Sequence, residues 1–97
     1  MAILVEYGNQ LKSIYLLKND DLISIESKIY ERFQFNIEQK QILQLQWYDT
    51  DFSRYIDLDV ETWLKFSTFL HNNGVESQRP LKLVQKQSIE RTNSTMG

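Results

Sequence analysis

The spacing of apolar residues changes twice along this chain, and this change constrains the fold more than any other sequence feature. In residues 11–17 the side chains divide between two faces at a spacing of two, with Ile14 and Leu16 on one face. The next group of apolar residues is spaced three, four and four positions apart: Leu22, Ile25, Ile29 and Phe33. From Leu43 the spacing is two again. A period of two is typical of a half-buried strand and a mean period near 3.6 of an amphipathic helix, so the sequence predicts strand, helix and strand in that order.

Two segments near the N-terminus predict a hairpin. Residues 3–7 are rich in β-branched and aromatic side chains, as strands usually are. Gly8 and Asn9 follow, and both residue types tolerate the positive φ angles of a tight turn. Residues 11–17 then supply the second strand, antiparallel to the first.

The second half of the chain predicts a short strand, a helix and a last strand, after which the domain ends. Residues 55–58 form a short strand, and Asp59 is expected to cap a helix whose apolar side carries Val60, Trp63, Leu64, Phe66 and Leu70. Residues 81–84 form a last strand. Residues 87–97 are polar without periodicity, so we expect a disordered tail or linker after a single domain over residues 1–86.

Composition excludes several classes of function. The 97 residues are 41% hydrophobic, enough for one modest core. There is no cysteine and a single histidine, which removes thiol chemistry, disulfides and most metal sites, so we expect no enzyme activity, no cofactor and no metal. A net charge of −2 argues against nucleic acid. No signal peptide or membrane span is visible, which predicts a cytoplasmic or nuclear protein without a membrane partner.

Acidic residues are concentrated in one segment of this nearly neutral chain. Residues 49–61 hold five carboxylates against one arginine, a local charge of −4, while the rest of the chain carries ten basic and eight acidic residues, or +2. The five are Asp49, Asp51, Asp57, Asp59 and Glu61. They span a strand end, a turn, a strand and a helix start, so they are predicted to share one surface patch that binds a basic protein surface.

The order β-β-α-β-β-α-β resembles the ubiquitin-like β-grasp, an α+β fold with one main helix across a mixed sheet. That resemblance implies that the first and last strands lie parallel at the sheet centre. The acidic segment itself resembles the OPCA-type motif of Phox/Bem-one domains, and equally the acidic strand–turn–helix of CIDE-N-like domains. The chain departs from the Phox/Bem-one pattern in two places: residues 52–54 stand where the loop has a glycine and an acid, and Glu6 stands where basic-face members carry lysine.

The resemblance implies a non-catalytic scaffolding or oligomerisation module that docks the basic surface of a related domain through the five acids. The local alternative is that these acids are only turn formers and helix caps. Phe52 lies within the turn and is either an exposed anchor for a partner or a plug over the sheet edge.

The basic residues suggest other partners. Lys12 and Lys18 lie on and after the second strand, where a Ras-binding type of β-grasp domain would meet an acidic GTPase. They also form a candidate basic counter-face for the acidic segment, which would allow homotypic, head-to-tail self-association.

Overall fold

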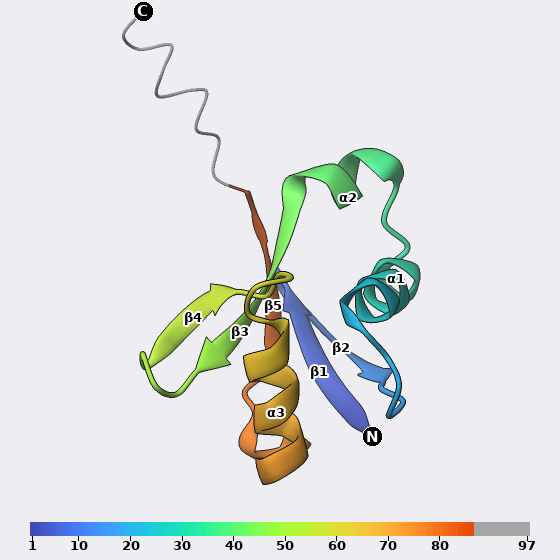
Figure 1. Ribbon diagram of the computed structural model, residues 1–97. Helices are drawn as coiled ribbons and strands as arrows, with labels where there is room; N and C mark the ends of the chain where they lie inside the picture. The colour runs from blue at the N-terminus through green and yellow to red at the C-terminus, as the bar shows by residue number, and fades with distance from the viewer. Residues whose placement is uncertain (87–97) are drawn as a thin grey trace, which may run out of the picture.

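The computed structural model describes residues 1–86 and has an α+β fold with one mixed five-stranded sheet (Figure 1). The predicted tail, residues 87–97, lies outside the described residues. In chain order the elements are β1 (Ala2–Tyr7), β2 (Gln10–Tyr15), α1 (Leu22–Phe33), α2 (Ile37–Ile42), β3 (Leu43–Asp49), β4 (Arg54–Asp57), α3 (Trp63–Asn73), the 3-10 turn η1 (Val75–Ser77) and β5 (Leu81–Gln85).

The sheet has the strand order β2-β1-β5-β3-β4. The first and last strands pair in parallel, with Val5 beside Leu81, and this confirms the predicted pairing. The other neighbouring strands are antiparallel. The predicted hairpin is also present, since β1 and β2 pair along their whole length and Gly8 at the turn has a φ of 57°. Within residues 1–86, β2 and β4 are therefore the two free edges of the sheet.

One face of the sheet carries the core, and both long helices pack on it. α1 contributes the predicted stripe, of which Ile25, Ile29 and Phe33 are buried, while α3 contributes Phe66 and Leu70. The strands add the alternate residues that face these helices: Ile3, Val5, Ile14, Leu43, Leu45, Trp47, Leu81 and Leu83. The opposite face of the sheet has no helix over it in the part of the chain that the structure describes (Figure 1).

The start of α3 differs from the prediction. The helix begins at Trp63, and Val60 and Leu64, which were expected on its apolar side, are 84% and 73% exposed. Leu64 is two residues from Phe66, which places it about 200° around the helix and away from the core. Val60 lies in the turn before the helix.

The short helix α2 was not predicted, because its six residues bury no side chain and so show no apolar stripe. Its sequence signal is the capping box of Asn36 and Gln39, in which each side chain bonds the backbone N–H of the other residue. α2 completes the connection from α1 to β3 (Figure 1). Among the described residues, no helix has both the length and the apolar character to cross a membrane.

Candidate functional site

Asp49 ends β3 on the core face and is almost wholly buried, with 1% of its surface exposed. One carboxylate oxygen accepts the backbone N–H of Asp51 at 2.9 Å. The other accepts a hydrogen bond from the Lys65 ammonium at 2.8 Å. The side chain therefore fixes the β3–β4 turn from inside, the role that the turn-forming alternative gives it.

Lys65 of α3 connects three residues of this turn. Its ammonium also lies 3.0 Å from the Asp51 carboxylate and 4.8 Å from the centre of the Phe52 ring. Hydrogen bonds to Asp49 and then Asp51 raise the pKa of Lys65 above its ordinary value. Phe52 is 61% exposed, so it is not a plug over the sheet edge. Lys65 thus neutralises part of the local negative charge.

Asp59 is half-buried and caps the turn that precedes α3, rather than the helix itself. Its Oδ1 accepts the backbone N–H groups of Glu61 and Thr62 at 3.0 and 3.1 Å. Thr62 is the residue that precedes the helix, and its hydroxyl donates to the Asp57 carbonyl at 2.8 Å. The expected helix cap at Asp59 is therefore wrong by three positions, although its local bonding is of the capping kind. Glu61 is exposed.

Asp57 lies on the opposite face of the sheet from Asp49. It pairs with Gln46 on β3, and the Gln46 amide donates to its carboxylate at 3.0 Å. Gln46 alternates with the core residues Leu45 and Trp47, so it points away from the helices. The five acids consequently do not share one patch: the structure brings together Asp49 and Asp51, and separates them from Asp57.

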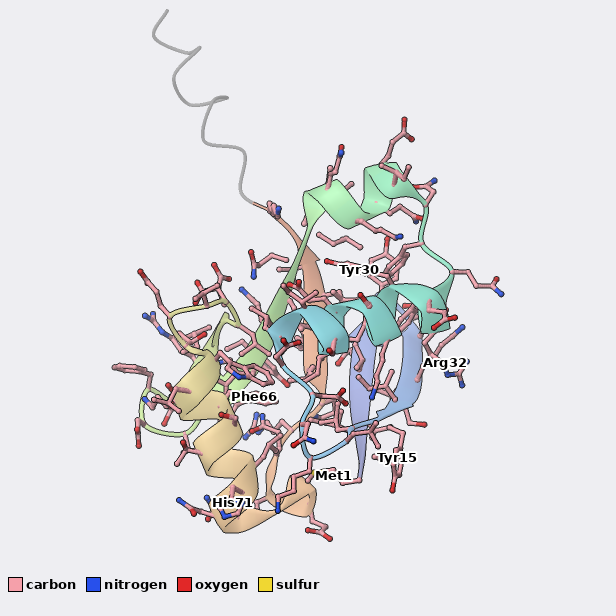
Figure 2. The ribbon with its side chains drawn as sticks, turned by 45° about the vertical axis from the view of Figure 1, so that its right-hand side comes forward. Met1, Tyr15, Tyr30, Arg32, Phe66 and His71 are labelled. Carbon is pink, nitrogen blue, oxygen red and sulfur yellow. The ribbon has the colours of Figure 1, made fainter. Side chains whose placement is uncertain are left out.

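A second candidate region, which we call the β2–α1 groove, runs between the free edge of β2 and α1. It has a volume of about 550 Å³ and is lined by residues of both elements, among them Ser13, Tyr15, Lys28 and Arg32. Figure 2 shows Arg32 on the side of α1 that faces β2. The Arg32 Nε donates to the Ser13 carbonyl at 3.2 Å, and the Lys28 Nζ to the Tyr15 carbonyl at 2.9 Å.

The bonding of Lys28 extends to the start of α1. Its ammonium pairs with Asp20, whose carboxylate also accepts the Leu17 backbone N–H. That backbone hydrogen bond, followed by the one from Lys28, lowers the pKa of Asp20. No ion pair within residues 1–86 involves Arg32, Lys12 or Lys18. The groove itself is of mixed charge, because Glu31 lines it together with Lys28 and Arg32.

The predicted basic residues lie near this groove without forming it. Lys12 stands over the Phe33 ring at 5.2 Å, and Lys18 is exposed in the loop after β2. The cations that contact the β2 edge, Lys28 and Arg32, were missed. Their separation of four residues, which places both on one side of a helix, is the sequence signal that could have found them.

The open face of the sheet carries two tyrosines next to cations. Arg79 lies 3.9 Å from the Tyr48 ring centre, and Lys82 lies 4.5 Å from that of Tyr55. The Tyr55 hydroxyl donates to the Pro80 carbonyl at 2.8 Å. The chain's own cations therefore cover these rings.

Within residues 1–86, no three histidine, aspartate or glutamate side chains come together as metal ligands. Comparison with known protein families, with curated proteins and with solved structures finds no match.

Proposed function

We propose that this chain is a non-catalytic protein-interaction module of the ubiquitin-like β-grasp type, and that it binds an extended acidic segment of another protein along the free edge of β2. The fold assignment is supported by the strand order, by the parallel pairing of β1 with β5 and by α1 packed over the sheet between β2 and β3 in the chain. A fold alone indicates no function, so the proposal depends on the β2 edge.

The observation that carries the proposal is a row of outward backbone groups on β2. Met1 and Leu16 exchange backbone hydrogen bonds, which sets the alternation of the β1–β2 ladder. Residues an odd number of positions from Leu16 therefore turn their N–H and C=O groups outward: Leu11, Ser13 and Tyr15. The bonds from Arg32 and Lys28 to the Ser13 and Tyr15 carbonyls agree with this alternation.

Charge determines what kind of strand fits this edge. A free edge is a template for strand addition, and it binds an extended peptide through main-chain hydrogen bonds. Here α1 places Lys28 and Arg32 on the outward carbonyls, so an incoming strand must replace those bonds. Carboxylates on the incoming strand would receive the displaced cations in charge-assisted hydrogen bonds, whereas a basic or apolar strand would leave them without an acceptor.

The experiment uses a labelled peptide that alternates valine or threonine with aspartate or glutamate, titrated against the whole chain by fluorescence anisotropy. We expect binding that weakens with salt and is lost in Arg32→Glu. Arg54→Glu is the matched control, because it makes the same charge change at the other sheet edge and should bind as the unmodified chain does. Hydrogen exchange at the Leu11, Ser13 and Tyr15 amides should slow on binding. Equal binding by both variants, or unchanged exchange, would refute the proposal.

The acidic segment is a second candidate surface, favoured by the exposure of Asp51, Phe52 and Glu61. Such a surface would dock a basic domain, with Phe52 as the apolar anchor at its centre. The test is a double variant, Asp51→Asn with Glu61→Gln, against a basic partner domain at low and high salt. It spares Asp49, whose buried carboxylate holds the turn. Binding that survives this double variant would exclude the acidic segment.

A further inference from the structure

A pocket at the C-terminal end of β2 specifies the partner segment further. It lies where the end of β2, the loop after it and α3 meet, has a volume of about 430 Å³, and has apolar walls of Leu16, Ile25, Trp63 and Leu70. Cavities of about 300–1,000 Å³ hold small ligands, so this one has room for a large apolar side chain. We call it the β2–α3 pocket. Met1, Tyr15 and His71, which also line it, are labelled near the lower end of the molecule in Figure 2.

The β2–α3 pocket and the β2–α1 groove adjoin each other. Tyr15 and Leu17 line both, and these side chains are 64% and 58% exposed. A strand that lies in the groove therefore extends over these two residues to the mouth of the pocket.

The spacing of the two cations along α1 matches the spacing of the carbonyl groups that they bond along β2. Lys28 donates to the Tyr15 carbonyl, which is nearest the pocket, and Arg32 donates to the Ser13 carbonyl, two residues farther from it. Four residues of helix advance about 6 Å, and two residues of strand about 7 Å. Carboxylates at alternate positions of an added strand would consequently face Lys28 and Arg32 in turn.

We propose that the bound segment pairs antiparallel to β2 and carries, in order from its N-terminus, one large apolar residue followed by alternating acidic residues. The antiparallel direction is the one that β2 already uses with β1, and antiparallel pairs are slightly more stable per residue. Since β2 runs toward the pocket, the N-terminal end of an antiparallel occupant lies there. The apolar residue then fills the β2–α3 pocket. This inference rests on the proposed function, because it takes the β2 edge as the binding site.

The experiment compares three peptides without tryptophan: a leucine followed by alternating acids, the same residues in reverse order, and the first peptide with its leucine replaced by alanine. Burial of a leucine side chain predicts that the first peptide binds at least about tenfold more tightly than the other two. Trp63 lines the pocket and Trp47 is buried in the core, so pocket filling should move the emission of Trp63 to shorter wavelength. Trp63→Phe should remove that change.

Ser67→Phe is the matching variant of the protein, because Ser67 lines the pocket but not the groove. We expect this variant to bind the first peptide about tenfold more weakly and to bind the alanine peptide with unchanged affinity. Thr68→Phe, on an exposed neighbouring position of α3, is the control and should change neither.

The outcomes separate the two proposals. If the three peptides bind with equal affinity and Arg32→Glu abolishes the binding of all three, the edge site stands and the pocket inference is refuted. If the reversed peptide binds more tightly, the antiparallel direction is refuted. If Arg32→Glu leaves every affinity unchanged, the proposed function is refuted, and the pocket inference with it.

Discussion

Asp49 is a buried acidic side chain with a structural role, although it lies in a segment whose charge suggests a binding surface. Its carboxylate is covered by the protein and accepts hydrogen bonds from a backbone N–H and from Lys65. A buried carboxylate needs such partners, because an unpaired one would be costly to remove from water. One of the five acids that the sequence assigns to a binding surface therefore contributes to stability.

We expect Asp49→Asn to lower the free energy of unfolding by about 1–3 kcal/mol, because it removes the charge that Lys65 bonds. Urea unfolding measures this. Asp51→Asn is the matched control, since the Asp51 carboxylate is exposed, and it should change stability by less than about 0.5 kcal/mol. Equal losses in both variants would contradict the structural role of Asp49.

Ser53 has a φ of 54°, a left-handed conformation that disfavours residues with a Cβ atom. It lies in the same β3–β4 turn. We expect Ser53→Gly to raise the free energy of unfolding by about 0.5–1 kcal/mol, since relief of strain outweighs the added freedom of the unfolded chain. Ser53→Ala keeps the Cβ and should bring no gain. Thermal unfolding of the two variants is the measurement.

At the scale of elements, α1 depends on two acids at its start. The Asp21 side chain accepts the Ser24 backbone N–H at 2.9 Å, and that bond lowers its pKa. The pKa of Asp20 is lowered as well, by the Leu17 N–H and then by Lys28. Both carboxylates stabilise the folded chain only while ionised, so this contribution is complete above their ordinary pKa of 3.8 and is lost as the pH falls through the lower folded values.

We therefore expect stability to fall with pH below about 4, and the fall to be smaller in Asp21→Asn, which is already less stable at neutral pH. Urea midpoints between pH 2 and pH 7 measure this. Asp57→Asn removes an acid outside α1 and serves as the control. Its urea midpoint should change with pH as steeply as that of the unmodified chain. A slope that is unchanged in Asp21→Asn would show that other groups dominate acid unfolding.

How far the sequence predicts each element depends on how much of the element is buried. The strands and α1 were predicted because half-buried elements repeat their apolar residues, as Ile25, Ile29 and Phe33 do. α2 buries no side chain and has no such signal. The site was predicted less well, because the bond between Lys65 and Asp49 joins residues 16 positions apart, and the face that Asp57 occupies depends on its register with Gln46. Neither relation is visible in local spacing.

At the scale of the whole molecule, the β2 edge of the sheet and the turn before β4 carry groups of opposite charge. The β2 edge lies beside Lys28 and Arg32, whereas the turn carries the exposed carboxylate of Asp51, which Lys65 neutralises in part. Two copies could thus meet front to back, and such a contact leaves each end free for another copy.

We expect weak self-association at low salt that disappears as salt is added, measured by light scattering over a concentration series. Arg32→Gln and Asp51→Asn should each be monomeric alone, because each loses one charged side of the contact. Their mixture keeps one intact pair, Arg32 of the second variant with Asp51 of the first, so it should form dimers and no longer chains. Self-association of either variant alone would exclude this contact.

The parallel pairing of β1 with β5 has a consequence for how the chain acquires its structure. Val5 of β1 pairs with Leu81 of β5 at the centre of the sheet. The first strand to be synthesised therefore cannot complete its pairing until the last strand has been synthesised. During synthesis on the ribosome, the apolar side of the β1–β2 hairpin stays without its final neighbour until about residue 85 has emerged. Contacts between such distant residues slow folding, because a long loop must close before any of them forms. The domain is therefore expected to fold after its own translation is nearly complete, which makes the nascent hairpin a natural substrate for chaperones.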